Sequence, residues 1–264
     1  MSARIRLSTA ARWALAGLLA VWFAIPFAPM LLRAFARRDQ QAWFPLHWDA
    51  SAAVTAFEHG GAEAFGRSVL LGLLVAAIAT PAGAIAGRAL ALGQAPAPRT
   101  LTAILFAPLL LPPLAAALGM NVLLLRAHIP ELAGLVIVLA ALATPYTTFS
   151  MRVAYAAYDL GYDEEARLLG ASGLQTLRRI HLPLIAPALG RSAFLAFLVG
   201  WSDYVVTVLI GGGQIVTLPL VAASAATGVG NDSMVAVLSL AAVVPPVVLL
   251  ALLARTPWQT GDRT

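Results

Sequence analysis

Charged residues divide this chain into long uncharged stretches, and this spacing constrains its fold more than any other feature. Five pairs of charges each enclose 20 to 26 uncharged residues, and a sixth apolar stretch, near residues 192–210, contains a single charge, Asp203. Because a transmembrane helix needs about 20 mostly apolar residues, we expect an all-α, polytopic membrane protein with six transmembrane helices. The enclosing pairs are Arg12 and Arg33, Arg67 and Arg88, Arg99 and Arg126, Glu131 and Arg152, and Asp232 and Arg255.

The six stretches predict one transmembrane domain over residues 1–264. A polar loop over residues 160–185 separates the fourth span from the fifth and is the one long polar segment between spans that we expect to be ordered. The spans are expected at about 13–35, 68–92, 100–125, 131–152, 190–210 and 233–254.

The first span also has features of a cleaved signal peptide. Three arginines precede it, and Ala34-Phe35-Ala36 follows it as an A-x-A pattern. Its apolar run is longer than the roughly 7–15 residues of a signal peptide. We therefore expect a retained helix.

Composition excludes several classes of function. Hydrophobic residues make up 60% of the chain and charged residues 11%, against about 25% charged in soluble domains. The chain has no cysteine, so it forms no disulfide or thiolate metal site. It has no lysine either, and a standard P-loop needs one, so ATP-driven work requires a partner. No catalytic motif and no metal-ligand spacing is present, and we predict neither an enzyme nor a cofactor in this chain.

The arginines predict how the spans are oriented. If the N-terminus is cytoplasmic, 12 arginines lie on the cytoplasmic side and 5 outside. Positively charged residues favour the cytoplasmic side, so we expect both termini and the polar loop in the cytoplasm, and no binding of nucleic acid. The outer cluster Arg33, Arg37 and Arg38 opposes this trend.

Local signals inside the polar loop predict two short helices around a glycine turn. Asp163 is a candidate N-cap, and Gly170 fits the C′ position that ends a helix. Ser172 and Gln175 have the spacing of a capping box for a second helix. Pro183 is expected to stop or redirect the chain before the next span.

The polar loop resembles the cytoplasmic loop of the membrane subunits of ABC importers. The family pattern is E-A-A, three residues, G, nine residues, then I-x-L-P. The chain departs from it at Glu165, where the family usually has alanine. The matching residues, at intact spacing, are Glu164, Glu165, Ala166, Gly170, Ile180, Leu182 and Pro183.

This resemblance implies the permease subunit of a type I ABC importer in a bacterial inner membrane. Such a subunit pairs with a second permease chain, identical or homologous, and works with a cytoplasmic ATPase dimer and an extracytoplasmic solute-binding protein. The polar loop would fit a cleft in the ATPase, and His181 would make an exposed polar contact. The implied coupling residues are Glu164, Glu165, Ala166, Leu168, Leu169, Gly170, Leu174, Leu177, Arg178, Ile180, Leu182 and Pro183.

A second, less specific similarity concerns the solute. The run Trp201–Tyr204 and the glycine-rich turn before Thr217 resemble the branch that imports ferric iron, thiamine or polyamines. Asp203, expected about two-thirds of the way across the fifth span, would lie on the path of a cationic solute together with Trp201 and Tyr204. The alternative for Asp203 is a structural hydrogen bond.

Two other functions fit a six-span chain. A stand-alone secondary transporter or channel predicts several ionisable residues inside the membrane, and we find one, Asp203. A non-transporting scaffold would use the polar loop only for docking.

Overall fold

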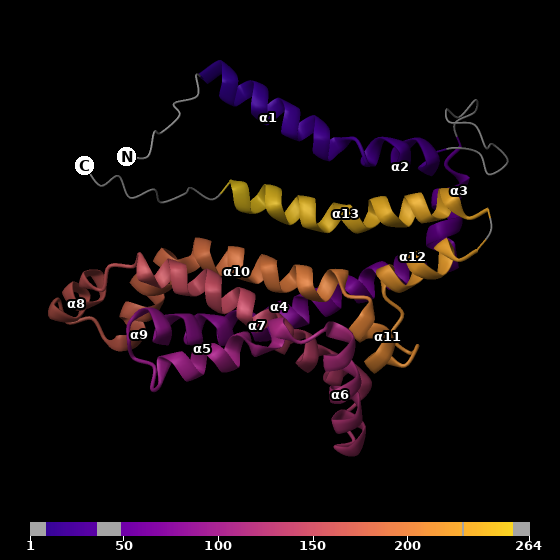
Figure 1. The fold of residues 1–264 in the computed structure, drawn as a ribbon. Coiled ribbons are helices and arrows are strands. Elements are labelled where there is room, and N and C mark those ends of the chain that lie inside the picture. The colour runs from indigo at the N-terminus through magenta and orange to yellow at the C-terminus, as the bar shows by residue number, and fades with distance from the viewer. Residues whose placement is uncertain (1–8, 36–48, 229, 256–264) are drawn as a thin grey trace, which may run out of the picture. The chain divides into compact units, whose positions relative to one another are not determined.

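The computed structural model describes residues 9–35, 49–228 and 230–255, and every regular element in these ranges is a helix (Figure 1). Contacts group the chain into two compact units. Unit 1 comprises Met1–Ala62 and Ala222–Ala241, and unit 2 comprises Glu63–Val221 and Ala242–Thr264. The single domain expected over residues 1–264 stays a prediction.

Unit 1 begins with two helices that are bent against each other. The candidate pair Ala11–Ala24 and Phe27–Ala34 is bent by 43°, at a break that contains Pro26. Near the end of α2, Arg33 forms an ion pair of 2.7 Å with Asp232 at the start of α13. Residues 36–48, which follow α2 and include Arg37 and Arg38, lie outside the described residues. The helices here are α1 (Thr9–Ala24), α2 (Phe27–Ala34), α3 (Ser51–Ala56) and the π-helix η1 (Phe57–Gly61).

The remaining elements belong to unit 2 or continue from one unit into the other. They are α4 (Ala62–Ala91), α5 (Pro98–Phe106), η2 (Ala107–Leu110), α6 (Pro113–Arg126), α7 (Glu131–Ala156), α8 (Gly161–Leu168), α9 (Gly173–Thr176), η3 (Leu177–His181), α10 (Leu182–Ser202), α11 (Val205–Gly211), α12 (Leu218–Ala226) and α13 (Asp232–Ala254).

The predicted number of spans agrees with the helices. Among the described residues, four helices are long and apolar enough to cross a membrane, and the number rises to as many as six if each of two bent pairs is one span. The second bent pair replaces the straight span expected at 100–125, because Pro98–Leu110 and Pro113–Arg126 meet at 104°. Pro112 lacks a backbone N–H and restricts the residue before it, which accounts for the break. The four unbroken helices are Ala62–Ala91, Glu131–Ala156, Gly173–Ser202 and Asp232–Ala254.

The fifth span differs from its predicted range of 190–210. Its helix runs continuously from Gly173 to Ser202. Asp203 then has an extended backbone, and this break separates the helix from α11. Pro183 does not stop the chain, since it lies in the first turn of α10 directly after the π-turn η3. Proline lacks the N–H for one backbone hydrogen bond, and the helix continues through it because the π-turn η3 already interrupts the regular pattern of these bonds.

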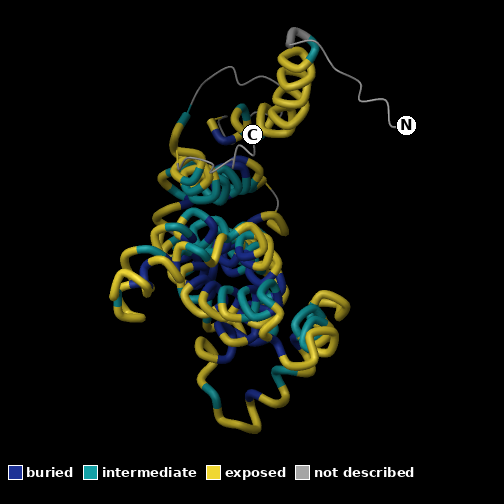
Figure 2. Tube along the Cα trace, turned by 90° about the vertical axis from the view of Figure 1, so that its left-hand side faces the viewer, coloured by how far each residue is buried: buried dark blue, intermediate teal, exposed yellow. Residues whose placement is uncertain are grey.

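Small residues bring α4, α7 and α10 into close contact in unit 2. A side chain on Gly72 of α4 would meet Phe197 of α10, and one on Gly87 would meet Met151 of α7. Figure 2 shows the buried positions gathered in dark blue among the helices of this unit. At these positions the missing side chains let the helix backbones approach closely.

Candidate functional site

The polar loop connects α7 to α10 and contains a complete helix-ending motif at Gly170. Gly170 has a φ of +85°, which strongly favours glycine. Its N–H donates to the carbonyl of Arg167 at 3.0 Å, and the N–H of Ala171 donates to the carbonyl of Ala166 at 3.0 Å. This pair of bonds is the Schellman motif. The predicted C′ position is therefore confirmed.

The predicted capping box is also present. The N–H of Ser172 donates to Oε1 of Gln175 at 2.8 Å, and the N–H of Gln175 donates to Oγ of Ser172 at 3.4 Å. The helix that it begins, α9, is one turn long and continues through η3 into α10. The sequence therefore predicted both the turn at Gly170 and the start of the helix after it.

Asp163 is not the N-cap of α8, contrary to the prediction. The helix begins at Gly161, and the carboxylate of Asp159 accepts the N–H of Gly161 at 2.9 Å. Asp163 lies within the first turn with 6% of its surface exposed. Its Oδ1 accepts a hydrogen bond of 2.7 Å from the hydroxyl of Tyr158. Its side chain thus points into the protein.

His181 is buried, although the sequence led us to expect an exposed contact. Only 4% of its surface is accessible. Its Nδ1 lies 3.3 Å from Oδ2 of Asp163, and its Nε2 lies 3.1 Å from the hydroxyl of Tyr155. The rings of Tyr155 and His181 stack with centroids 5.7 Å apart. We call Tyr155, Tyr158, Asp163 and His181 the Asp163–His181 network.

Burial in this network changes the acidity of Tyr158. Removal from water raises the pKa of its hydroxyl above the ordinary value, and the hydrogen bond to Asp163 raises it further. Both effects favour the protonated phenol, which is the form that donates to the carboxylate. Tyr158 therefore remains a hydrogen-bond donor across the neutral pH range.

The π-turn η3 explains why His181 reaches the interior. The buried positions in and around it are Thr176, His181, Ile185 and Ala188. An α-helix repeats a face every three or four residues, whereas Thr176 and His181 are five residues apart. A π-turn holds one extra residue and so places His181 on the buried face. The sequence does not predict this burial, because a π-turn has no clear sequence signal. An interval of five residues between apolar or buried positions on one helical face would be the pattern that indicates it.

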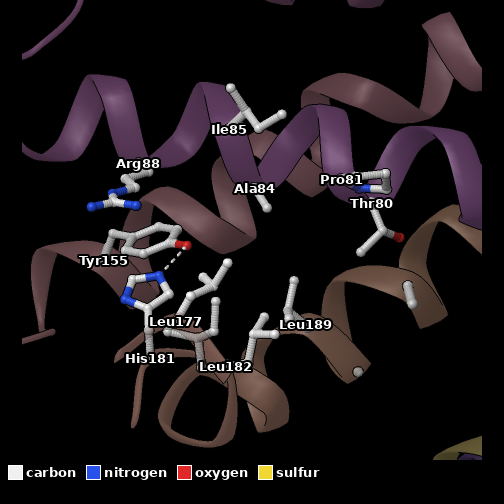
Figure 3. A pocket seen from close by; sticks show the side chains of 13 residues that line it. Thr80, Pro81, Ala84, Ile85, Arg88, Tyr155, Leu177, His181, Leu182 and Leu189 are labelled. Carbon is white, nitrogen blue, oxygen red and sulfur yellow. Dashed lines mark hydrogen bonds between the residues drawn. The ribbon is translucent and has the colours of Figure 1, made fainter. Parts of the chain in front are cut away.

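A cavity of about 560 Å³ lies beside the network, between α4, α7 and α10 (Figure 3). Tyr155 and His181 line one end of it together with Arg88, as the close-up shows. Nε of Arg88 is buried and has no hydrogen-bond partner among the described residues. The other lining residues are Thr80, Pro81, Ala84, Ile85, Leu177, Leu182, Ile185, Leu189, Gly190 and Ala193, so the cavity is mostly apolar.

Several leucines of the polar loop are exposed. Leu168 and Leu169 are 87% and 89% exposed, and Leu174 is also exposed. We call these three residues the apolar tip. Among the other predicted coupling residues, Ala166 is buried and Ile180 is partly buried, whereas the rest are exposed: Glu164, Glu165, Gly170, Leu177, Arg178, Leu182 and Pro183.

The residues predicted for a solute path lie in different environments. Trp201 is buried, packs against Phe65 and Phe197, and donates its indole N–H to the carbonyl of Ala242 at 3.0 Å. Asp203 is partly buried at the break after α10, and not within the span as expected. Its Oδ2 accepts the N–H of Thr207 at 2.8 Å and the hydroxyl of Thr207 at 2.9 Å. These bonds match the structural alternative for Asp203.

Comparisons with known proteins agree with this architecture. A family model described as "Binding-protein-dependent transport system inner membrane component" matches residues 69–256. No curated protein matches the chain. A similar solved structure is titled "Crystal structure of a bacterial ABC transporter involved in the import of the acidic polysaccharide alginate". Its TM-score is 0.69 at 15% identity, and the match covers 97% of this chain and 98% of that one. At this identity the likeness shows the fold alone.

Proposed function

The chain belongs to the family of binding-protein-dependent transport system inner membrane components, and we propose that this type I ABC importer permease couples ATP hydrolysis to solute uptake through its polar loop. Membership rules out the stand-alone secondary transporter or channel. A multi-pass inner-membrane protein of this family works with other ABC transporter subunits. In our proposal the polar loop and both termini lie in the cytoplasm, where arginines are most frequent.

The apolar tip is the observation that carries this proposal. Leu168 and Leu169 are almost fully exposed at the end of a short helix whose geometry the Schellman motif defines. Exposed leucines on an ordered turn favour a site of protein contact. We propose that the tip enters a cleft in a cytoplasmic ATPase dimer, with Glu164, Glu165 and Arg178 making polar contacts around it.

The remaining partners follow from the same proposal. A second permease chain, identical or homologous, completes the path, and an extracytoplasmic solute-binding protein delivers the solute. The ATPase binds ATP, and this chain holds no cofactor of its own. The solute is a small molecule of the iron, thiamine or polyamine class, supported by the Trp201–Tyr204 run and by the carboxylate of Asp203.

Charged substitutions in the apolar tip test this function. Leu169→Asp removes an apolar contact and adds a charge at a position that contributes little to folding, since the side chain is exposed. We expect normal amounts of the variant in the membrane, but at least about tenfold less co-purified ATPase, because burying an unpaired carboxylate at an interface is costly. Uptake into proteoliposomes should fall in parallel.

A matched control adds the same charge elsewhere. Gln94→Asp changes an exposed residue in the connection between α4 and α5, and it should leave ATPase binding and uptake unchanged. If Leu168→Asp and Leu169→Asp both retain full ATPase binding, the docking role of the polar loop is wrong.

A further inference from the structure

We propose that the Asp163–His181 network is the joint through which movement of α8 reaches the membrane spans α7 and α10. This inference rests on the proposed function and assigns positioning roles to Asp163, His181, Tyr155 and Tyr158. None of these four residues belongs to the exposed surface that we expect the ATPase to contact. Their role would be to convert docking into movement of the spans.

The attachment of α8 to the rest of unit 2 is small. Of its eight residues, only Asp163 and Ala166 are buried. Ala166 offers a single methyl group, which resists sliding weakly. Asp163 offers two oxygens, and both face polar groups of other segments. Among the side chains of α8, Asp163 therefore makes the strongest attachment to the rest of unit 2.

The two oxygens of Asp163 connect α8 to both neighbouring spans. Oδ1 accepts the hydroxyl of Tyr158, two residues beyond the end of α7. Oδ2 faces His181, the last residue of η3, directly before α10. A push on α8 therefore acts on the ends of α7 and α10 together.

The contact between His181 and Tyr155 closes the network. Tyr155 lies in the last turn of α7, and its hydroxyl meets Nε2 of His181 at 3.1 Å. The tyrosine and histidine rings also pack face to face. Hydrogen bonds to a buried carboxylate are directional and stronger than those between neutral groups. The network thus holds α7, α8 and α10 in one arrangement, whereas apolar contacts alone would let them slide.

The Asp163–His181 network also has room to move. Tyr155 and His181 line the cavity of about 560 Å³ together with Arg88 of α4 (Figure 3). A densely packed surrounding would resist any change in these side chains. A largely apolar cavity beside them allows α10 to shift against α4 when the polar loop is displaced.

Uncoupling is the signature that tests this inference. Asp163→Asn and His181→Gln should still co-purify with the ATPase and support ATP hydrolysis in proteoliposomes. The amount of solute taken up per ATP hydrolysed should fall by about tenfold. This fall lies within the roughly 5–150-fold range typical of coupling between two sites. Tyr158→Phe deletes only one hydroxyl and should lower this ratio less. Its control is Tyr162→Phe, which deletes the same group from an exposed residue of α8 and should leave the ratio unchanged.

The double variant Asp163→Asn with His181→Gln separates joint action from independent effects. If the residues act as one unit, the double variant should lose no more coupling than either single variant. The inference is overturned if the ratio of uptake to hydrolysis is unchanged in Asp163→Asn, His181→Gln and Tyr158→Phe. It is also overturned if the rate of uptake and the rate of ATP hydrolysis fall in parallel. Failure of the unaltered chain to bind the ATPase would instead overturn the proposed function. Should Asp163→Asn fail to fold, the comparison of Tyr158→Phe with Tyr162→Phe decides.

Discussion

Thr147 of α7 fills the space that a side chain on Gly83 of α4 would occupy. A Cβ on Gly83 would overlap Oγ1 and Cβ of Thr147. The Thr147 hydroxyl also donates to the carbonyl of Ala79 on α4 at 2.8 Å. The two spans are therefore held together by a hydrogen bond that only a very small residue at position 83 permits.

Enlarging Gly83 should separate these spans. We expect Gly83→Leu to lower the thermal midpoint of the detergent-solubilised protein, because overpacking a well-packed contact costs about 1–3 kcal/mol. Gly119→Leu is the control, since a Cβ atom at Gly119 in α6 would meet no atom within 4 Å. Equal melting temperatures for the two variants would contradict the packing described for Gly83.

Substitutions of Gly170 should separate backbone strain from lost docking. Its φ of +85° disfavours most side chains, and a Cβ there would meet nothing within 4 Å. Asparagine and aspartate both tolerate positive φ better than most residues, so the two variants carry similar backbone strain. We expect Gly170→Asp to retain less ATPase than Gly170→Asn, because it also adds a charge. Both variants should reach the membrane in normal amounts. Co-purification with the ATPase measures the difference, and full association of Gly170→Asp would contradict docking at this turn.

The orientation of the polar loop can be measured with fusions. A reporter that is active only in the cytoplasm should give a signal when fused after Gln175, because this loop lies on the side with more arginines. The same reporter fused after Ala50 should stay silent. The opposite pattern would reverse the proposed orientation.

Asp203 has two possible roles, a structural one through its hydrogen bonds to Thr207 and a role on the solute path. Replacing its carboxylate by an amide distinguishes them. Asn can still accept these bonds through its side-chain oxygen, so with a structural role alone Asp203→Asn would transport with normal rate and affinity. We propose a path role for the carboxylate, and we expect Asp203→Asn to weaken uptake of a cationic solute several-fold, since the attraction of a negative charge in a low-dielectric site is lost. Uptake kinetics of a cationic solute decide between these outcomes.

Signals confined to a few neighbouring residues were reliable predictors for this protein. The capping box at Ser172 and the turn at Gly170 depend on the conformations and hydrogen bonds of adjacent residues, so their residue types identify them. The number of spans also follows from the chain alone, because apolar length and charge spacing determine which stretches can cross a bilayer.

Longer-range relationships required the tertiary structure. The sequence determined that this is a helical membrane protein with an ordered polar loop, but it did not indicate that His181 meets Asp163 beneath that loop. That contact depends on the extra residue of η3 and on the position of α7 against α10. Likewise, Asp163 resembles an N-cap in sequence, and only the neighbouring Tyr158 and His181 turn its carboxylate inward. Packing between distant segments overrides local preference because a buried carboxylate is stable only where partners surround it.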